Sequence, residues 1–323
     1  MTGKLKMSLS LDLDNKWSYL RTYGNAAWKD YPSYLDLVVP RILGFLAERG
    51  IRITFFIVGK DAALAKNRAA IASLSAAGHE LANHSYLHEP WLHLYSEKDF
   101  DRDLQMAEEA IQDVTGVRVN GFRGPGYSLT ETTLRVLRKR GYKYDATAFP
   151  NILNPLSRAY LFATTKLSKD EKKKRKALFG SFADALRPVK PYRWQLDDGF
   201  LPELPVTTMP FFKVPIHFSY LMFLGTFSTH LSRLYLTFSI GMCKLTRTEP
   251  SLLLHPLDFM GKEDDSDLAS FPAMSLPLQK KMKLLNMYFA QLLESFEPLT
   301  IGEHVDKILM KQPLRSFQPN FAR

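Results

Sequence analysis

Short apolar runs alternate with helical patterns through the first half of the chain. The runs at 7–13 and 51–58 are rich in hydrophobic residues, and the second is almost continuous, as in strands that are buried on both faces. Helical spacing of apolar residues predicts helices at 34–49, 68–77, 97–114 and 130–140, each ending near a glycine. Further short strands are expected at 80–83, 121–123 and 143–145. The alternation predicts an α/β fold with a mostly parallel sheet.

The second half of the chain breaks this alternation with a basic segment. Residues 151–194 contain the run Lys172, Lys173, Lys174, Arg175 and Lys176, followed by an amphipathic pattern at 177–186. We expect an inserted helical and basic segment at 151–194 that is separate from the repeating strand and helix units. The regular pattern returns later, with strands expected at 204–207, 251–254 and 298–300 and a helix at 278–295.

A second unusual segment, 211–245, is apolar and aromatic. Its central part, 214–232, has no charged residue and is long enough to suggest a transmembrane helix. It also contains Pro215, two histidines and several hydroxyl residues. These features favour a lid or a membrane-facing segment that lies in the interface over a spanning helix.

The charge balance points to an anionic partner. Lysine and arginine number 43 against 33 acidic residues, which gives a formal net charge of +10. Such a surplus is typical of proteins that meet nucleic acid, an acidic membrane or a phosphorylated substrate, although an inert basic surface also has it. No zinc-finger or aromatic RNA-binding motif accompanies it, so we expect no nucleic-acid partner. A single cysteine, Cys243, and the absence of a signal peptide before the first strand predict a cytoplasmic protein.

Residues suited to metal binding follow two of the predicted strands. Asp12 and Asp14 are two residues apart at a strand end, so their side chains share a face, where two like charges favour a cation or a proton between them. His84 and His88 are four residues apart, and on a helical turn both imidazoles would project to one side. One carboxylate and two imidazoles suit zinc, with cobalt, nickel or iron as substitutes. A solvated acid pair and surface histidines are the simpler alternative.

Several short motifs follow one another in an order that is informative as a whole. They are Leu11-Asp12-Leu13-Asp14, the segment 78–88 (GHELANHSYLH), 122–127 (FRGPGY), Tyr144-Asp145 and 253–256 (LLHP). Together they resemble the polysaccharide deacetylase family, carbohydrate esterase family four, which contains the NodB-homology domain. The resemblance extends from about residue 7 to residue 256, and the histidine segment is its most specific part. It implies that 1–323 form a single catalytic domain, a distorted (β/α) barrel of about seven strands.

The resemblance also implies a ligand set and a general base. Asp14, His84 and His88 would hold a divalent transition metal, most often zinc. Asp12 would be the general base that deprotonates water, and Arg123 would keep it ionised and oriented. The first motif is Asp-x-Asp here, whereas many members have adjacent aspartates, so base and ligand are assigned by their order.

The remaining motifs supply an acid and an oxyanion site by the same resemblance. His255 would protonate the leaving amine, and Asp145 would stabilise its charged form. A backbone N–H near Tyr127 would bind the oxyanion, although one extra residue precedes this aromatic position. Asp258, three residues after His255, either contacts substrate or caps a turn.

An N-acylated aminosugar is the substrate that the family implies. A cytoplasmic member would act on a lipid-linked or phosphorylated glycan precursor at the inner membrane face and remove an acetyl or formyl group. The basic run from Lys172 to Lys176 and the apolar segment 211–245 would then contact an anionic membrane surface or the lipid phosphate. The alternatives are a soluble small-amide hydrolase of the allantoinase-like kind and a catalytically silent barrel that only binds ligands. The sequence leaves the oligomeric state open.

Overall fold

The computed structural model describes residues 3–89, 91–165, 167–176, 178, 182–311 and 313–321. The strands are β1 (Leu5–Asp12), β2 (Thr54–Ile57), β3 (Glu80–Asn83), β4 (Gly121–Phe122), β5 (Tyr144–Asp145), β6 (Tyr192–Leu196), β7 (Gly199–Glu203), β8 (Ser251–Leu254), β9 (Phe296–Leu299) and β10 (Ser316–Phe317). The helices are α1 (Lys16–Thr22), α2 (Leu35–Ala47), α3 (Gly59–Ala63), α4 (Arg68–Ala76), α5 (Glu97–Thr115), α6 (Glu131–Lys139), α7 (Asn154–Thr164), α8 (Lys169–Lys174), α9 (Phe182–Ala185), α10 (Phe218–Phe227), α11 (Thr229–Leu245), α12 (Leu278–Ser295) and α13 (Ile301–Lys311).

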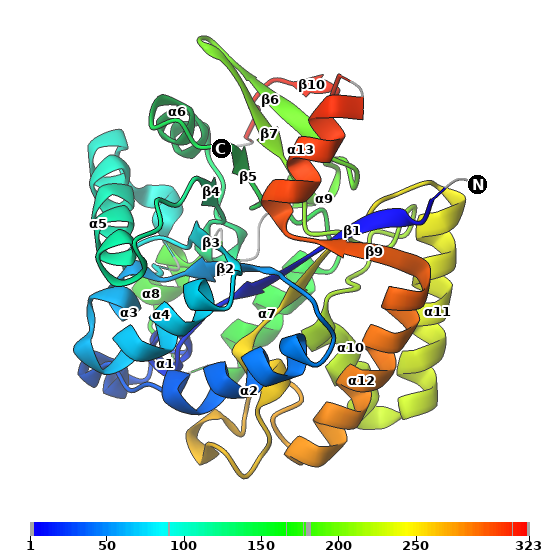
Figure 1. The fold of residues 1–323 in the computed structure, drawn as a ribbon. Coiled ribbons are helices and arrows are strands. Elements are labelled where there is room, and N and C mark those ends of the chain that lie inside the picture. Colours follow the sequence, from blue (N-terminus) through cyan, green and yellow to red (C-terminus); the bar gives the residue numbers. More distant parts are fainter. Residues whose placement is uncertain are drawn as a thin grey trace.

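The strands form a mainly parallel sheet that the helices surround (Figure 1). Its order is β10–β6–β7–β5–β4–β3–β2–β1–β8, and β9 pairs with β1. The run from β7 to β8 is parallel throughout, and β6 joins it as the antiparallel partner of β7. These seven parallel strands confirm the predicted α/β architecture. β6 and β10 were not predicted, whereas β9 overlaps the strand predicted near 298–300.

The segment 204–208 links the two ends of the parallel run. Leu204 N–H donates to the carbonyl of Asp145 at 2.9 Å, and Thr207 N–H donates to the carbonyl of Ser251 at 2.9 Å. Ser251 N–H returns a bond to Thr207 Oγ1 at 2.8 Å. The segment therefore connects β5 with β8 and closes the sheet into a distorted barrel. The strand expected at 204–207 was placed too late, because β7 ends at Glu203. The backbone of 204–207 bonds first to β5 and then to β8, so it does not continue as a strand paired with a single neighbour.

The alternation within β1 places polar groups inside the barrel. Met7, Leu9 and Leu11 are fully buried in the main apolar core, which includes residues of α2 and α12. Side chains alternate along a strand, so the intervening residues face the other side. Those residues are Ser8, Ser10 and Asp12, and all are buried. One face of β1 therefore contributes apolar side chains to the core outside the barrel, and the other face places two serines and an aspartate inside the barrel.

Local capping sequences explain why most helix boundaries were predictable. α5 begins after Ser96, whose hydroxyl accepts the N–H of Asp99 at 3.2 Å, and ends at Gly116 in the left-handed conformation (φ 69°). α6 begins after Thr130, whose hydroxyl accepts the N–H of Thr133. The predicted helices at 34–49, 68–77, 97–114 and 130–140 are confirmed to within two residues, and the predicted helix at 278–295 is α12.

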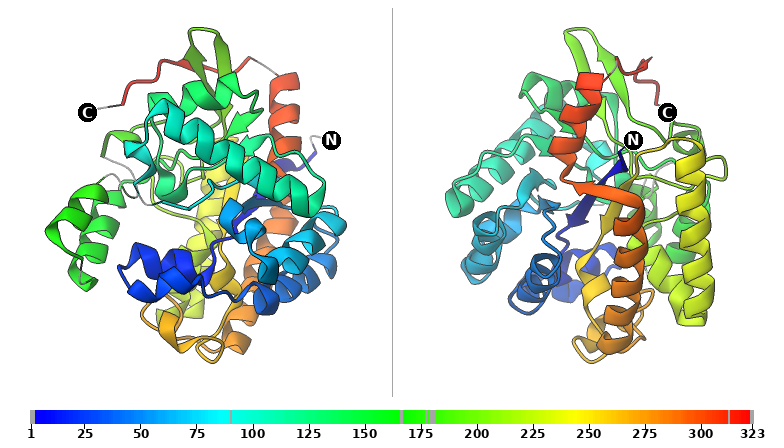
Figure 2. Two further views of the ribbon diagram at one scale, coloured as in Figure 1. Left: turned by 90° about the vertical axis from the view of Figure 1, so that its left-hand side faces the viewer. Right: turned by 45° about the vertical axis from the view of Figure 1, so that its right-hand side comes forward.

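The segment 151–194 is largely helical, as expected. It contains α7, α8 and α9, and the α7 region lies outside the ring of barrel elements in Figure 2. Its predicted end was wrong, because β6 begins at Tyr192 and belongs to the sheet. Part of the amphipathic pattern at 177–186 lies outside the described residues, at 177 and 179–181.

The apolar segment 211–245 contains two packed helices, α10 and α11. The break between them is Ser228, which has extended backbone angles and caps α11 through its hydroxyl. Phe218 and Leu221 of α10 are fully buried, whereas Phe227 is 70% exposed. Among the described helices, none combines the length and apolar character needed to cross a membrane.

Candidate functional site

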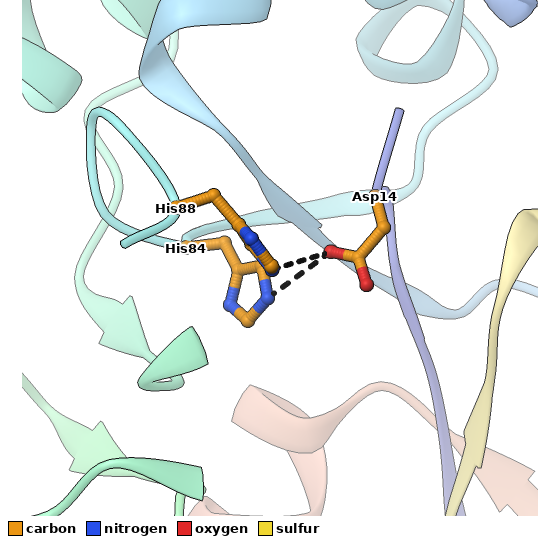
Figure 3. A group of neighbouring side chains, drawn as sticks. All are labelled: Asp14, His84 and His88. Atoms are coloured by element: carbon orange, nitrogen blue, oxygen red, sulfur yellow. Dashed lines mark ion pairs between the residues drawn. The ribbon is translucent and has the colours of Figure 1, made fainter. Parts of the chain in front are cut away.

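Three side chains predicted as metal ligands converge at the ends of β1 and β3 (Figure 3). Asp14 Oδ1 lies 2.9 Å from Nε2 of His88 and 3.4 Å from Nε2 of His84. One ligand atom from each residue lies within 4.8 Å of the other two. All three residues are buried. The structure thus brings one carboxylate and two imidazoles to a single point.

The two histidines reach this point from an irregular loop. We expected a helical turn, but residues 84–89 follow β3 without forming a helix. Ser85 (φ 65°) and His88 (φ 48°) both adopt positive φ, and Asn83 Oδ1 accepts the N–H of Ser85 at 2.8 Å. The side chains therefore converge because the loop folds back on itself.

Hydrogen bonding determines which nitrogen of His84 faces the site. Nδ1 lies 2.7 Å from the carbonyl oxygen of Arg123, which can only accept, so Nδ1 carries the proton. Nε2 therefore points towards Asp14 with its lone pair when the ring is neutral. Burial alone would lower the pKa of His84, but the charges of Asp12 and Asp14 raise it. Burial alone would raise the pKa of Asp14, but the opposite charge of His88 and hydrogen bonds from both histidines lower it well below its usual range.

This arrangement favours a proton or a cation at its centre. A carboxylate oxygen of Asp14 and the Nε2 atoms of both histidines converge there, and the carboxylate and the neutral His84 ring can only accept at this point. A proton on one or both histidines satisfies the site, as the shifted pKa values of His84 and Asp14 indicate. A divalent transition metal satisfies it equally, because carboxylate and imidazole are its usual ligands and these atoms already lie close together. The residues present therefore fit the implied metal.

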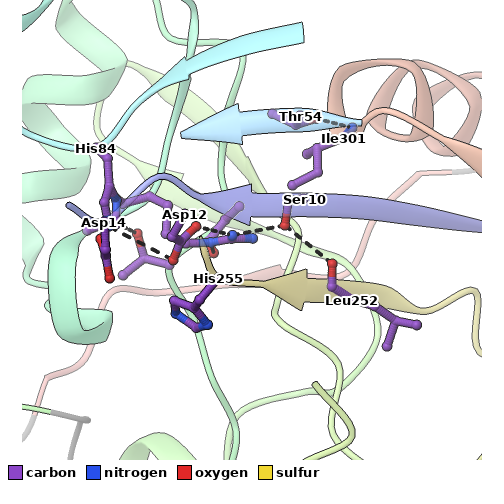
Figure 4. Close-up of polar contacts among 12 residues, drawn as sticks. Ser10, Asp12, Asp14, Thr54, His84, Leu252, His255 and Ile301 are labelled. Atoms are coloured by element: carbon purple, nitrogen blue, oxygen red, sulfur yellow. Dashed lines mark hydrogen bonds and ion pairs between the residues drawn. The ribbon is translucent and has the colours of Figure 1, made fainter. Parts of the chain in front are cut away.

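The second acid, Asp12, is held by a buried arginine (Figure 4). Nη1 of Arg123 donates to Asp12 Oδ1 at 2.7 Å and to Ser10 Oγ at 2.9 Å, and its Nε donates to the carbonyl of Ala146 at 2.8 Å. The guanidinium group also lies 4.2 Å from the centre of the Phe56 ring. Asp12 Oδ2 is left 3.9 Å from Nε2 of His84. One carboxylate oxygen is thus fixed by the arginine while the other faces the histidines.

His255 follows β8 on the same side of the barrel (Figure 4). Its Nδ1 lies 3.0 Å from Oγ of Ser219, a residue of α10. Its backbone N–H donates to Asp258 Oδ2 at 2.8 Å. Asp258 is buried and caps the turn that follows β8. Of the two roles considered for Asp258, the structure shows the cap.

Asp145 lies in a different environment from the one expected. It pairs across the sheet with Glu203 and accepts a hydrogen bond from the hydroxyl of Thr147. Burial, followed by the charge of Glu203, raises the pKa of Asp145 well above its usual range. The side-chain contacts of Asp145 are with Thr147 and Glu203, while the observed side-chain partner of His255 is Ser219. We therefore revise the expectation that Asp145 supports His255.

The same pair of carboxyl groups supports the arginine loop. Thr147 Oγ1, which bonds to Asp145, also accepts the N–H of Gly124 at 2.8 Å. Glu203 accepts the N–H of Ala148 at 2.9 Å and the indole N–H of Trp194 at 2.9 Å. These bonds fix the chain on both sides of the loop that begins at Arg123.

The predicted oxyanion donor is already used within a turn. Tyr127 N–H donates to the carbonyl of Gly124 at 3.1 Å, and Tyr127 has a positive φ of 61°. In this conformation that N–H does not point into the site. The Tyr127 ring packs on Phe149 with centroids 4.5 Å apart, and Phe149 contacts the His217 ring at 5.7 Å. His217 in turn lies 6.5 Å from His255, so a row of rings extends from the arginine loop to the predicted acid.

The basic cluster is divided between the surface and the interior. Lys173, Lys174 and Lys176 are exposed and Lys172 is half-buried, as a surface role requires. Arg175 is only 2% exposed, and its Nη2 donates to the backbone carbonyl of Arg21 at 3.0 Å. Its guanidinium also lies 5.3 Å from the centre of the Trp91 ring. Arg175 therefore anchors α8 to the barrel, and its predicted contact with membrane or lipid phosphate is wrong for this conformation.

Sequence reasoning missed three polar residues of the site: Ser10, Glu203 and Ser219. The signal for Ser10 was present, because Ser8, Ser10 and Asp12 alternate with leucines along the first strand. Ser219 was a hydroxyl residue within an uncharged apolar run, which was ascribed to a lid. Glu203 had no comparable signal, because its partner Asp145 is distant in sequence.

Comparisons with known proteins agree with the geometry. Residues 28–144 match the polysaccharide deacetylase family. The peptidoglycan deacetylase of Helicobacter pylori is 25% identical over 162 residues, which cover 48% of this chain and 53% of that protein. The chitooligosaccharide deacetylase of Sinorhizobium fredii is 36% identical over 102 residues, which cover 29% of this chain and 46% of that protein. The matched region thus spans about half the length of these curated relatives.

The fold similarity extends further along the chain than the sequence similarity. A crystal structure from Mycobacterium smegmatis, assigned as a polysaccharide deacetylase, aligns over 99% of this chain and 97% of that chain. The TM-score is 0.62 at 20% sequence identity. The two proteins therefore share a fold.

Proposed function

We propose that this chain, which belongs to the polysaccharide deacetylase family, is a metal-dependent hydrolase that removes an N-acyl group from an aminosugar. The observation that carries the proposal is the convergence of Asp14, His84 and His88 beside the Asp12–Arg123 pair. Two relatives are named as deacetylases of peptidoglycan and of chitooligosaccharides, both of which contain N-acetylated sugars. The acyl group is acetyl or formyl.

The metal would be held by Asp14, His84 and His88, and zinc suits this donor set best. Cobalt, nickel and iron accept the same ligands. A divalent metal held there lowers the pKa of water and polarises an acyl carbonyl. The hydrogen bond from His84 Nδ1 to the Arg123 carbonyl supports the proposal, because it orients the other ring nitrogen towards the metal position.

Asp12 would take the proton of the attacking water. Arg123 occupies its Oδ1, which leaves Oδ2 on the side of the histidines. The fixed orientation matters because a general base must lie within hydrogen-bond reach of the proton that it removes. His255 would then give a proton to the leaving nitrogen. Asp12 ends β1 and His255 follows β8, and these strands are neighbours in the barrel, so the sheet sets both positions.

The row of rings beside the site suits a sugar. Tyr127, Phe149 and His217 line the path from the arginine loop to His255. Apolar ring faces pack against the C–H groups of a sugar while the polar groups of the site bind its acyl amide. We propose that Tyr127 contributes to substrate binding through its ring.

We further propose that the sugar is lipid-linked or phosphate-bearing and is met at the inner face of the cytoplasmic membrane. The segment 211–245, which contains α10 and α11, carries a set of exposed apolar residues that we call the apolar ridge. It comprises Phe211, Phe212, Phe223, Phe227, Leu231, Leu234, Phe238 and Leu245. Ring contacts link Phe212 with Phe238 and Phe223 with Phe227.

Charge favours an anionic lipid surface as the partner of the apolar ridge. Residues 204–248 contain no aspartate or glutamate, whereas Arg233, Lys244 and Arg247 are exposed. Basic residues near an anionic leaflet contribute about 1 kcal/mol each. α10 also carries Ser219, which contacts His255, so the same helix joins the proposed membrane surface to the site.

The exposed lysines Lys173, Lys174 and Lys176, together with the half-buried Lys172, would add to this attraction. Arg175 is excluded from the group because its contacts are internal. The amine groups could also pair with a lipid phosphate. Recognition by charge alone is reversible and salt-dependent, which suits a peripheral protein.

Mass spectrometry of lipid-linked glycan precursors tests the substrate proposal. Cells that lack the protein should accumulate a precursor that is heavier by one acyl group than the precursor in wild-type cells. Restoring the wild-type chain should remove this species, and restoring the Asp12→Asn variant should not. Unchanged lipid-linked precursors together with an accumulated soluble amide would instead support the small-amide hydrolase.

A further inference from the structure

Helix α10 brings a hydroxyl group against the predicted acid. Ser219 lies in the first turn of α10, and its Oγ is 3.0 Å from Nδ1 of His255. The helix is anchored by Phe218 and Leu221, which are fully buried, and Phe218 packs on Phe289 of α12 with ring centroids 5.1 Å apart. The position of Ser219 is therefore set by core packing.

A buried carboxylate completes the contact from the other side. Asp258 accepts the backbone N–H of His255 at 2.8 Å, and the nearby Ser219 hydroxyl favours its ionised form. Burial raises the pKa of Asp258 above its usual value, and the charges of His255 and Lys281 offset only part of this effect. Lys281 is itself buried and donates to the carbonyl of Leu257 at 2.7 Å, which fixes the turn that carries Asp258.

The hydroxyl proton determines the direction of this chain of bonds. A serine has one proton to donate and an ionised carboxylate can only accept, so Ser219 donates to Asp258. The serine oxygen must then accept from His255, which places a proton on Nδ1. Nε2 is left to face the site. This tautomer is the one that a proton donor acting through Nε2 requires.

We propose that Ser219 and Asp258 are positioning residues for His255 and take the part that the family resemblance suggested for Asp145. This inference rests on the proposed function. As the C–N bond of the substrate breaks, its electron pair stays on nitrogen, which takes the proton from Nε2. The Nδ1 proton stays on the ring, hydrogen-bonded to Ser219. His255 thus passes from the charged to the neutral form, and Asp258 stabilises the charged form before transfer.

The surroundings of His255 identify the carboxylate that matters. Its charged and titratable neighbours are His217 just before α10, Asp258 in the turn after β8 and Asp12 of β1, and Lys281 of α12 acts on Asp258. Burial lowers the pKa of His217 to about 3, so this ring is neutral. Asp12 is already paired with a buried arginine. Asp258 is therefore the carboxylate left to act on His255.

Comparison of an amide with an activated ester tests the positioning role. An amine leaving group needs a proton, whereas p-nitrophenolate leaves without one, so p-nitrophenyl acetate does not require the acid. With N-acetylated chitooligosaccharides, Ser219→Ala and Asp258→Asn should each lower kcat by about 10-fold. Ester hydrolysis should change little, and Ser219→Thr should recover most of the amide activity. Ser239→Ala, which removes a buried hydroxyl of α11 bonded to the Tyr235 carbonyl, is the matched control and should leave both activities unchanged.

The outcomes separate this inference from the proposed function. Wild-type amide turnover in Ser219→Ala would overturn the positioning role and leave the deacylase proposal intact. An equal loss on amide and ester would also overturn it, because that result indicates general damage to the site. The double variant should lose no more than the more impaired single variant, since both residues act through His255. Absence of amide hydrolysis by the metal-loaded wild-type protein would reject both proposals.

Discussion

At the scale of single residues, the protonation of the ligand atoms determines whether the site can bind a metal. The Arg123 carbonyl places a proton on Nδ1 of His84, and the opposing groups at Asp14 are drawn together by charge. Against the effect of burial, the charge of Asp12, followed by Asp14, raises the pKa of His84, and the charge of His88, followed by bonds from both histidines, lowers the pKa of Asp14. A metal ion has to compete with protons for these atoms, so metal affinity should fall as the pH decreases.

Removal of one imidazole should remove the metal. His84→Ala eliminates one of three ligands, and elemental analysis of the purified variant should show far less than one metal per chain. Far-ultraviolet circular dichroism should be close to that of wild type, because residues 84–89 form neither helix nor strand. His230→Ala, at an exposed histidine of α11, serves as the control and should keep its metal. A full complement of metal in His84→Ala would show that this ligand set is wrong.

Asp12 and His255 should act as base and acid without holding the metal. Asp12→Asn and His255→Ala should each lower kcat by roughly 100-fold or more while the metal content stays near that of wild type. The wild-type pH profile of kcat/KM should be bell-shaped, and each variant should lose one limb. Near-normal turnover by Asp12→Asn would exclude it as the base.

Residue types and spacings made the metal ligands predictable, while partners distant in sequence were not. Asp14, His84 and His88 were identified from their chemistry and their order along the chain. The state of Asp145 depends on Glu203, which reaches it across the sheet. The burial of Arg175 depends on a contact with Arg21, 154 residues away. No local pattern contains such information.

At the scale of elements, the sequence predicted helix boundaries well where capping residues are present. It predicted strands well where polar and apolar residues alternate. Ser96 and Gly116 enclose α5, and β1 shows its two faces directly in its sequence. The segment 211–245 gave no such division, because hydrophobic residues occur all around α10. Only the packing reveals that one side of the helix pair is buried while the apolar ridge is exposed.

The lysines at the end of α8, of which Lys172 is half-buried and the others exposed, should contribute to membrane binding. Replacing Lys172, Lys173, Lys174 and Lys176 by Gln, with Arg175 retained, should weaken binding to anionic liposomes by roughly 10-fold or more. Added salt should weaken wild-type binding in the same direction. A water-soluble substrate analogue should be hydrolysed at the wild-type rate.

A matched variant controls for net charge. It replaces four exposed lysines from other parts of the surface, Lys98, Lys262, Lys283 and Lys307, by Gln. Both variants lose the same charge, so only position differs between them. Equal liposome binding by the two would argue against a localised membrane surface and favour a soluble substrate.

At the scale of the whole molecule, the barrel is tied together at the start of its first strand. Glu249, just before β8, accepts Lys6 N–H of β1 at 3.1 Å and the Lys311 amine of α13 at 3.0 Å. Nε2 of His304 lies 3.5 Å from its other oxygen. The parallel order of the strands was predictable from the repeating pattern. The contacts of Glu249 and the closure of the barrel through 204–208 could not be predicted, because both depend on single contacts between segments distant in sequence.

Glu249 should stabilise the fold in a pH-dependent way. Burial alone would raise its pKa, but His304, Lys6 N–H and Lys311 lower it from 4.5 to about 2. The native state then binds fewer protons than the unfolded state, so the stabilisation is complete above the unfolded pKa and is lost as the pH falls towards 2. Glu249→Gln should lower the free energy of unfolding by roughly 1 kcal/mol at pH 7 and by much less near pH 2.5. Glu294→Gln, at an exposed position of α12, should have no such pH-dependent effect.

Acyl release from an N-acetylated aminosugar oligomer, measured as a function of bound metal, tests the central claim most directly. The purified chain would be stripped with a chelator, reloaded with increasing zinc and assayed for free acetate and free amine together. We predict that activity is absent in the stripped protein and rises in proportion to bound zinc until one equivalent per chain is reached. Equal acetate release with and without bound metal, or no release by the fully loaded protein, would contradict the account.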